Sequence, residues 1–321
     1  SLMSEETIKV VVSRRQEQGH GVVVLDMVSA NGGELPAFEA GAHIDLHLGE
    51  GLVRQYSLCG SPAERRTYRL GILQDPNSRG GSVAAHAHLR EGTEVRVGVP
   101  RNHFPLSMDA SRSVLVGGGI GVTPMIAMAH ALADAGKDFE LHYCGRSRSA
   151  SAFIDELNAS PFSDRVHLHF DDEAAAQKLD LAQALANTPP GTHVYTCGPA
   201  GFMDWVIGEA SRLGIPDAQV HKEYFQATAP SGGTAFEVIA KKSGKRVRVE
   251  ADQSIVQALA GVGIKVTMSC EQGVCGTCLC TVLEGTPDHR DVFLTDEEKA
   301  DNDQILLCCS RARSDTLVLD I

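Results

Sequence analysis

The chain has 321 residues, a length that indicates two or three domains. Its composition, 43% hydrophobic and 22% charged, is typical of folded, soluble globular domains. The formal net charge of −12 at pH 7 argues against non-specific binding to nucleic acid or to anionic membranes, so neither is expected as a partner.

Nine cysteines would suit a disulfide-bonded secreted protein, but their number is odd and the chain is long. A reducing, cytoplasmic compartment is therefore predicted. The N-terminal SLMSEETIKV has no basic region followed by an apolar core, so we expect no signal peptide. The uncharged run at residues 113–133 has the length of a membrane span, but its glycines and Pro124 favour a strand, a turn and a buried helix.

Residues 4–105 read as short strands, because β-branched side chains alternate with polar ones and turn residues separate the segments. The predicted strands are IKVVVS, GVVVLDMV, HIDLHL, YSLCG, TYRLGIL and EVRVGVP. Six short strands at this spacing predict a closed antiparallel β-barrel.

The tetrapeptide RQYS lies inside this predicted barrel. A strand places Arg54 and Tyr56 on one face. There the aromatic ring could stack on a flavin while the cation neutralises phosphate. An ordinary edge strand is the alternative interpretation.

A glycine turn follows in the same domain. Gly80 and Gly81 open a predicted helix whose free N–H groups and positive dipole end suit a phosphate, and Ser82 adds a hydroxyl donor. A plain N-cap at Ser82 with two turn glycines is the alternative.

In this order, the two stretches resemble the flavin-binding barrel of the ferredoxin reductase superfamily. The resemblance implies that the first stretch contacts flavin and phosphate and that the glycine–serine turn binds phosphate. The flavin-binding candidates that it implies are Arg54, Tyr56, Ser57, Gly80, Gly81 and Ser82.

Residues 106–226 change to alternating strands and helices, a pattern that predicts an α/β domain with a parallel sheet covered by helices on both faces. The turn GGGIGVTP follows the first strand and opens a helix, at the edge where such sheets bind ligands. It differs from the G-x-G-x-x-G fingerprint because Pro124 stands in the place of the last glycine. A second turn, CGPAG, also lies between a strand and a helix.

The paired turns resemble the NAD(P) domain of ferredoxin reductases. The resemblance implies that the first turn faces the pyrophosphate and nicotinamide and that the cysteine of the second lies near the nicotinamide. The nucleotide-binding candidates are Gly118, Gly119, Gly121, Thr123, Cys197, Gly198 and Pro199, and Thr123 and Cys197 are also catalytic candidates.

Two further positions come from the same resemblance. It places Arg146 and Ser147 near the adenosine ribose. Arginines there would favour the 2′-phosphate of NADPH, whereas Asp171 and Asp172 would repel that phosphate. A solvated loop is the alternative interpretation of the arginines. Phe225 is the candidate for an aromatic side chain that covers the flavin and yields to the nicotinamide, which makes it a third catalytic candidate. A core aromatic residue that ends a strand is the alternative.

Residues 227–235 read as a small, polar linker. Residues 236–321 then show a hairpin, a helix at SIVQALAGVG and a closing strand at TLVLDI, which is the order of a β-grasp α+β domain. The charged run DHRD at residues 288–291 is expected to be exposed, in contact with a partner or the flavin domain; a surface salt-bridge loop is the alternative.

Four cysteines of this last domain have a diagnostic spacing, with four, two and twenty-nine residues between them. They are Cys270, Cys275, Cys278 and Cys308. This is the plant-type ferredoxin spacing, and it predicts a [2Fe–2S] cluster on four thiolates. Zinc, a disulfide pair or buried structural cysteines are the alternatives, but the second Cys-x-x-Cys pair of a zinc site is missing. Cys280 and Cys309 are expected to be packed thiols.

The tail is similar to the ferredoxin domains of the phthalate dioxygenase reductase family, which includes vanillate O-demethylase reductases. The runs EGTPDHRDVFLTDEE and CCSRAR carry this likeness, and the resemblance extends over nearly the whole chain. It implies FMN rather than FAD, NADH rather than NADPH, and a Rieske-type terminal oxygenase as the protein that accepts the electrons.

The expected function is therefore to pass electrons from NADH through FMN and a [2Fe–2S] cluster to an oxygenase that acts on an aromatic or similar small compound. Two alternatives stay open. One is a self-contained reductase of a small acceptor such as a ferric chelate or a quinone. The other is a redox sensor that does not turn over.

Overall fold

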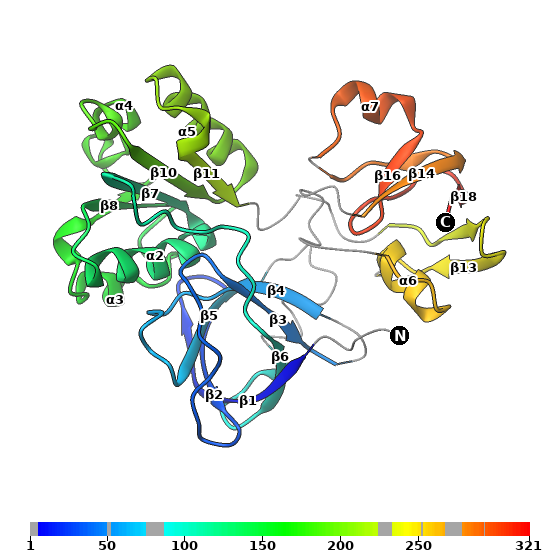
Figure 1. The fold of residues 1–321 in the computed structure, drawn as a ribbon, viewed down its shortest axis with the longest axis horizontal. Coiled ribbons are helices and arrows are strands. Elements are labelled where there is room, and N and C mark those ends of the chain that lie inside the picture. Colours follow the sequence, from blue (N-terminus) through cyan, green and yellow to red (C-terminus); the bar gives the residue numbers. More distant parts are fainter. Residues whose placement is uncertain are drawn as a thin grey trace. The chain divides into compact units, whose positions relative to one another are not determined.

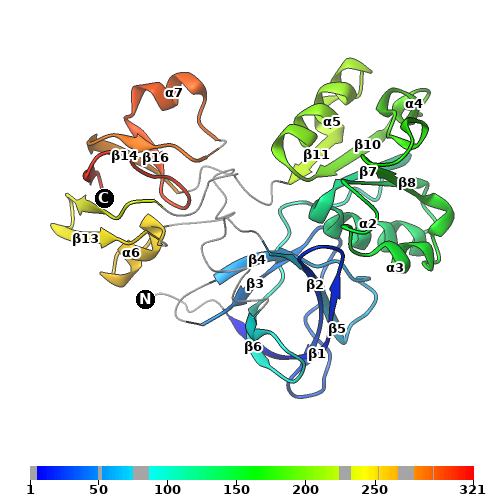
Figure 2. The same cartoon turned by 180° about the vertical axis from the view of Figure 1, so that it is seen from behind.

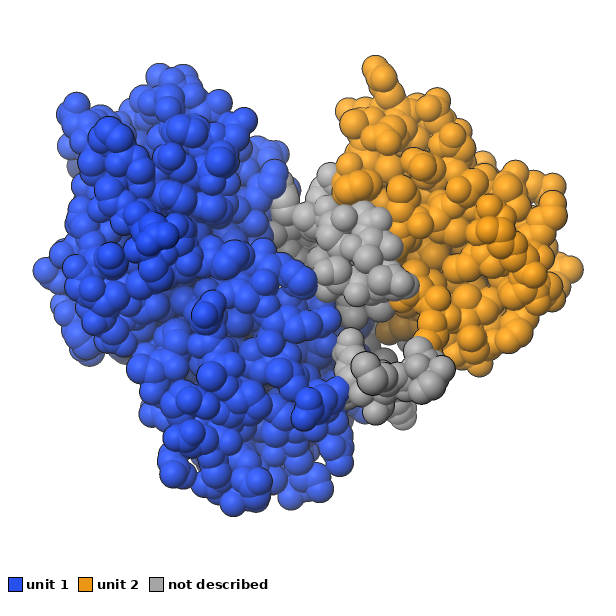
Figure 3. All heavy atoms as spheres, in the orientation of Figure 1, with its two compact units in different colours: residues 1–75, 81–223 blue, residues 76–80, 224–321 orange. Residues whose placement is uncertain are grey.

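The computed structural model describes residues 6–49, 53–74, 87–223, 233–251, 253–266, 278–291 and 293–321. They form two compact units, one of described residues up to Glu223 and one of described residues from Gly233 onward (Figure 3). Within these ranges, no helix is both long enough and apolar enough to span a membrane.

The first unit begins with a six-stranded antiparallel sheet of order β4-β3-β6-β1-β2-β5 (Figure 1). Its strands are β1 (Thr7–Gln18), β2 (Val22–Ser29), β3 (His43–His47), β4 (Val53–Ser57), β5 (Thr67–Leu73) and β6 (Glu94–Gly98). Inward-facing valine, leucine and isoleucine side chains, among them Val10, Val23, Ile44 and Leu70, fill its interior. The predicted antiparallel barrel is thus confirmed.

The fourth strand differs from the prediction, which placed it at residues 56–60. β4 ends at Ser57, and just beyond it the N–H of Cys59 donates to the carbonyl of Arg69 in β5 at 2.9 Å. The chain therefore changes partner and links the two edge strands of the sheet. Leu58 and Cys59 are fully buried by this crossing, so the apolar pattern continues past the end of the strand.

The second half of this unit is a five-stranded parallel sheet of order β11-β10-β7-β8-β9. Its strands are β7 (Arg112–Gly118), β8 (Phe139–Gly145), β9 (Val166–Phe170), β10 (Thr192–Cys197) and β11 (Val220–Glu223). The helices are α2 (Val122–Asp134), α3 (Ile154–Asn158), α4 (Leu181–Leu185) and α5 (Ala200–Arg212), with 3₁₀ turns η1 (Gly119–Gly121), η2 (Ser163–Arg165), η3 (Ala175–Gln177) and η4 (Asp217–Gln219).

Helices cover both faces of the parallel sheet, as predicted (Figure 1 and Figure 2). Val114, Val116 and Val194 pack beneath α4 and α5 on one face. α2 lies on the other face, between the sheet and the barrel, and its residues from Val122 to Ala129 are all buried. This double burial explains why the sequence of α2 is apolar all round rather than amphipathic.

The second unit contains a mixed five-stranded sheet of order β13-β12-β18-β14-β16, in which β12 and β18 are parallel and the other pairs antiparallel. Its strands are β12 (Phe236–Ala240), β13 (Lys245–Val249), β14 (Leu279–Glu284), β16 (Gln304–Leu306) and β18 (Thr316–Leu319), with a separate pair β15 (Pro287–Asp288) and β17 (Arg311–Ala312). The helices are α6 (Ile255–Gly261) and α7 (Asp296–Asp301). A hairpin, a helix and a closing parallel strand confirm the predicted β-grasp order.

Both helices of this unit start at a capping box. At α6 the Ser254 hydroxyl accepts the N–H of Gln257 at 3.0 Å, and the Gln257 side chain accepts the N–H of Ser254 at 2.9 Å. Thr295 and Glu298 make the same exchange at α7. Such a cap stabilises a helix by about 1 kcal/mol, which matters for helices as short as these.

The charged run at residues 288–291 is not exposed as expected. Asp291 is buried, and its Oδ2 accepts the N–H groups of Phe293 at 3.1 Å and Leu294 at 2.8 Å. Arg290 forms an ion pair with Asp288 at 2.9 Å. The carboxylate of Asp291 accepts hydrogen bonds from the backbone N–H groups of the following turn. This part of the run therefore stabilises the fold.

Candidate functional site

Two glycine turns meet at one edge of the parallel sheet. The neighbouring strands β7 and β10 pair Gly117 with Cys197, so the turns that follow them lie side by side at the carboxyl edge. α2 and α5 begin directly after these turns, and no described side chain caps the N-terminus of either helix. Two helix N-termini, each the positive end of a helix dipole, therefore converge on an edge that suits the phosphates of a dinucleotide.

The turns touch each other through their backbones, which explains their glycines. A Cβ on Gly121 would lie 2.3 Å from the carbonyl oxygen of Cys197, and a Cβ on Gly118 would lie 2.9 Å from the ring of Phe202. Gly119 adopts a φ of +55°, a left-handed conformation that glycine adopts without strain. The two turns, at residues 117–124 and 197–201, together form a backbone-lined site that we call the cradle. Side chains at these glycine positions would take up space in the cradle, so the turns fit a ligand that approaches the backbone closely.

A half-buried carboxyl group lies beside these turns at Glu223, the last residue of β11. The Ser57 hydroxyl, at the end of barrel strand β4, donates to Glu223 Oε1 at 3.3 Å, and strand pairing sets Glu223 beside Cys197. Burial raises the pKa of Glu223 to about 7, although the hydrogen bond from Ser57 acts in the opposite direction. This carboxyl group can therefore exchange a proton near neutral pH. Sequence analysis did not select it.

Cys197 is a neutral thiol in this setting. The side chain is fully buried, burial raises the pKa of the Cys197 thiol well above its usual range, and the neighbouring Glu223 raises it further. A reactive thiolate needs a positive and partly exposed environment. Cys197 therefore suits close packing against a bound ligand rather than covalent chemistry.

Strand β4 carries three of the flavin candidates. Pairing with β3 sets Arg54 opposite Leu46 and Tyr56 opposite Ile44, so the arginine and the tyrosine share one face. The half-buried Tyr56 ring packs against the barrel core, and burial raises the pKa of its hydroxyl to about 12, so the hydroxyl stays neutral. A flat ring, a cation and the Ser57 hydroxyl within four residues fit a flavin that carries a phosphate.

Thr123, in the first turn of α2, uses its hydroxyl within the protein. The hydroxyl donates to the carbonyl of Ile120 at 3.0 Å, and the side chain is buried. It closes the 3₁₀ turn that precedes the helix. Thr123 therefore shapes the cradle, and its methyl group is directed towards Gly71 of barrel strand β5, 3.1 Å from where a Cβ on that glycine would lie.

The end of β8 brings basic and acidic residues together. The N–H of Asp172 donates to the carbonyl of Arg146 at 3.3 Å, so the turns after β8 and β9 are joined. Arg148 forms an ion pair with Glu173 at 3.2 Å. Ser147 accepts a backbone N–H through its hydroxyl. Because acidic side chains offset the arginines here, the edge offers no net positive charge for a 2′-phosphate.

Two of the predicted cluster ligands meet in the core of the second unit. Cys278 precedes β14 and Cys308 follows β16, and both are buried in the same hydrophobic core. Cys309 is buried in the same core, and Cys280 is packed against it, as expected for thiols outside the four-ligand pattern. Two converging thiols supply half of the ligand set of a [2Fe–2S] cluster.

A buried arginine that sequence analysis did not select supports the segment after Cys308. Arg311 is 1% exposed and donates to the carbonyl oxygens of Gln253 at 2.7 Å and Glu250 at 3.1 Å. Its guanidinium also stacks on the ring of Phe236, 5.0 Å from the ring centre. The arginine ties the segment after Cys308 to the chain entering α6. The run CCSRAR was the available signal, because it places this arginine close to the predicted fourth ligand.

Some of the predicted site residues lie outside the described residues. They are Gly80, Gly81, Ser82, Phe225, Cys270 and Cys275. Their assignments stay predictions.

The comparisons with known proteins agree with this arrangement. Residues 238–313 match the 2Fe-2S iron-sulfur cluster binding domain family. Residues 99–220 match the family described as dimethylamine monooxygenase subunit DmmA-like, N-terminal domain.

Similar proteins cover the whole length of the chain. A vanillate O-demethylase oxidoreductase from Pseudomonas sp. (strain HR199 / DSM 7063) is 49% identical over 98% of this chain and 100% of its own. The phenoxybenzoate dioxygenase subunit beta of Ectopseudomonas oleovorans is 43% identical over 94% of this chain and 93% of its own. The solved structure of phthalate dioxygenase reductase, described as a modular structure for electron transfer from pyridine nucleotides to [2Fe–2S], superposes with a TM-score of 0.92 at 36% identity, covering 98% of both chains.

The fold, the paired turns and the cysteine motif define a flavin- and iron–sulfur-dependent oxidoreductase that serves an oxygenase. The chain belongs to the phthalate dioxygenase reductase family. The expected cofactors, FMN, NADH and a [2Fe–2S] cluster, are those of this class.

Proposed function

We propose that residues 4–105 bind FMN, residues 106–226 bind NADH, residues 227–235 act as a linker and residues 236–321 hold the [2Fe–2S] cluster. The observation that carries this assignment is the hydrogen bond from Ser57 to Glu223. It joins the strand with the flavin candidates to the edge with the nucleotide candidates. Flavin and nicotinamide bound by these residues would therefore be neighbours.

When bound, a flavin takes two electrons from a nicotinamide and can release them singly to an iron–sulfur cluster. The protein's contribution is to bind and orient these groups. Arg54 neutralises the flavin phosphate and Tyr56 packs on the ring system. The backbone N–H groups at Gly119 and Gly198 bind the pyrophosphate of NADH, and Cys197 packs near the nicotinamide.

Glu223 and Ser57 hold a proton next to the reacting rings. With a pKa of about 7, the Glu223 carboxyl group is protonated in part of the molecules at neutral pH and can exchange that proton. The Ser57 hydroxyl fixes the orientation of the carboxyl group. The assignment of Thr123, Cys197 and Phe225 as the side chains closest to the reaction remains part of this proposal.

In the second unit, Cys278 and Cys308, with Cys270 and Cys275, are the proposed ligands of the cluster. The buried pair excludes water from one side of the site. Arg146 and Ser147 are proposed to contact the adenosine ribose, in a mixed-charge edge that favours NADH over NADPH.

The electron acceptor is proposed to be a Rieske-type terminal oxygenase in the cytoplasm. Since a relative at 49% identity is a vanillate O-demethylase oxidoreductase, an oxygenase that demethylates a methoxylated aromatic acid is the first partner to test. Other relatives serve different oxygenases by name, so the substrate is set by the oxygenase rather than by this chain.

An anaerobic titration of the purified protein with NADH tests the proposal. The released flavin is identified first, iron and sulfide are measured, and the absorbance of flavin and cluster is followed during the titration. We expect FMN, two irons per chain, and bleaching of both chromophores by NADH but not by an equal amount of NADPH. Electron transfer to a purified vanillate demethylase oxygenase then tests the partner.

The outcomes separate the steps. Bound zinc without flavin would contradict the proposal as a whole. A flavin that is bleached while the cluster stays oxidised would contradict the transfer from the first unit to the second. Full reduction without turnover of the demethylase would reject that partner and leave the electron path intact.

A further inference from the structure

Phe153 has an unusual backbone conformation. Its φ is +68°, and among the described residues the only other non-glycine residues with positive φ are two asparagines, Asn187 and Asn302. Asparagine tolerates the left-handed region, whereas a bulky aromatic residue adopts it at a cost of about 1–2 kcal/mol. Such strain persists only when the surroundings hold the residue in place.

The surroundings that hold Phe153 come from the barrel. Its N–H donates to the side-chain oxygen of Gln18, at the end of β1, at 2.8 Å. The preceding chain is also held, because the N–H of His20 donates to the carbonyl of Ala150 at 3.2 Å. A Cβ on Gly19 would lie 2.4 Å from the same carbonyl oxygen, so the turn between β1 and β2 is in direct contact with the loop that precedes α3.

The Phe153 ring packs where barrel strand β5 approaches the turn at the start of α2. It is 1% exposed and lies over Gly71 in barrel strand β5, where a Cβ would be 2.7 Å from Cζ. The same Cβ would be 3.1 Å from the methyl group of Thr123, so the ring and the methyl group both border the space above the glycine. Thr123 closes the nucleotide turn through its bond to Ile120.

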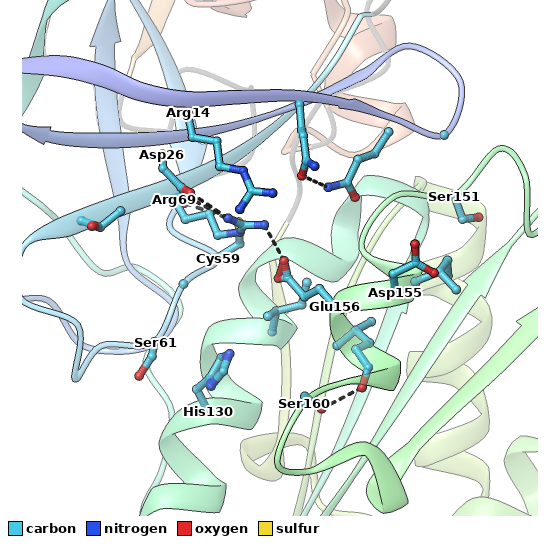
Figure 4. A pocket seen from close by; sticks show the side chains of 18 of the residues that line it. Arg14, Asp26, Cys59, Ser61, Arg69, His130, Ser151, Asp155, Glu156 and Ser160 are labelled. Atoms are coloured by element: carbon cyan, nitrogen blue, oxygen red, sulfur yellow. Dashed lines mark hydrogen bonds and ion pairs between the residues drawn. The ribbon is translucent and has the colours of Figure 1, made fainter. Parts of the chain in front are cut away.

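An ion-pair bridge stabilises the helix that follows Phe153. Arg69 in β5 donates to Asp26 of β2 at 2.9 Å and to Glu156 of α3 at 2.6 Å (Figure 4). The bridge lines an open pocket between barrel and helices, together with Cys59 and His130. It anchors α3 from the side, whereas the ring of Phe153 lies over Gly71 next to the space that the Thr123 methyl group also borders.

We propose that Phe153 is a positioning residue for hydride transfer, whose ring sets the spacing between the flavin barrel and the nucleotide turn. This inference rests on the proposed function of that turn. The ring faces Gly71 on the barrel side, and on the nucleotide side it shares the space above that glycine with the methyl group of Thr123. A shift of the ring would therefore move one binding element relative to the other, and hydride transfer is sensitive to displacements of about 1 Å.

The test uses the full-length holoprotein in three forms, Gly71→Ala, Phe153→Leu and the double variant. Gly71→Ala inserts a methyl group into the ring, and Phe153→Leu removes the ring edge that the methyl group would meet. Anaerobic stopped-flow mixing with NADH gives the rate of flavin reduction at saturation, the NADH affinity and the long-wavelength charge-transfer absorbance. We expect each single variant to lower the saturating rate and this absorbance about tenfold while NADH affinity changes much less.

The double variant should recover to within about threefold of the unaltered protein, because the smaller side chain makes room for the added methyl group. Phe162→Leu is the control. Phe162 is a buried phenylalanine of the same region that packs on His130 and Phe139, away from Gly71, and its loss should lower the melting temperature but leave rate and charge-transfer absorbance unchanged.

The inference is overturned if the single variants lower the melting temperature but keep the saturating rate and the charge-transfer absorbance. It is also overturned if the double variant is as slow as the slower single variant. Failure of NADH to reduce the unaltered protein is a separate result, since it would contradict the proposed function itself.

Discussion

Replacement of Glu223 by glutamine should make the stability of the first unit less dependent on pH. Burial raises the pKa of this carboxyl group from 4.5 to about 7. Its contribution is fully present below pH 4.5 and is lost as pH rises through 7, because the unfolded chain ionises first. At about 1.4 kcal/mol per pKa unit, the total loss is about 3 kcal/mol, of which about 2 kcal/mol falls between pH 5.5 and 8. Glu223→Gln retains the acceptor for Ser57 and removes this loss.

Urea unfolding at pH 5.5 and pH 8, followed by tryptophan fluorescence, measures the effect. Trp205 on α5 is the only tryptophan of the chain and reports on the first unit. The free energy of unfolding of Glu223→Gln, relative to the unaltered protein, should rise by about 2 kcal/mol between the two pH values. Glu209→Gln, which changes a carboxyl group paired with Arg212 on α5, should show no such rise. An equal difference at both pH values for Glu223→Gln would refute the reasoning.

Three further results are expected. Gly121→Ala places a methyl group 2.3 Å from the carbonyl oxygen of Cys197 and should weaken NADH binding at least about tenfold, measured by titration of flavin absorbance, with flavin content unchanged. Cys308→Ser should lower bound iron and cluster absorbance while NADH still reduces the flavin; intact cluster absorbance would contradict the ligand assignment. Burial lowers the pKa of His142, although its hydrogen bond with Glu140 acts in the opposite direction, so the free energy of unfolding should fall as pH drops below 6.5, and His142→Gln should flatten this part of the curve in urea unfolding at several pH values.

Much of the fold could be predicted because local patterns and tertiary structure agree. β-branched alternation located the barrel strands, and the apolar run at residues 113–133 is a strand, a turn and a helix as expected. The error at β4 arose where the chain leaves β3 to bond with β5. Leu58 and Cys59 are buried by that change of partner, and periodicity does not distinguish this burial from burial within a strand.

The site was predictable only in part. Cysteine spacing and glycine turns are local signals, and they selected Cys278 and Cys308, which lie in one core, and the two glycine turns, which lie side by side. The pairing of Ser57 with Glu223 joins residues 166 positions apart, so no local pattern reveals it. Sequence patterns also do not predict the left-handed backbone conformation of Phe153, because the hydrogen bond that holds it joins Phe153 to a glutamine 135 positions away.

The burial of α2 between sheet and barrel decides where this reductase can be divided. A cut near residue 105 would separate the barrel from α2, would expose Ile126 and would break the bridge between Arg69 and Glu156. A cut in the proposed linker at residues 227–235 falls after Glu223, the last residue of the first unit, and so leaves that unit whole. The barrel and the parallel sheet should therefore be kept together as one unit in protein engineering. The β-grasp domain is the part to replace when the electron carrier is exchanged or fused to another oxygenase.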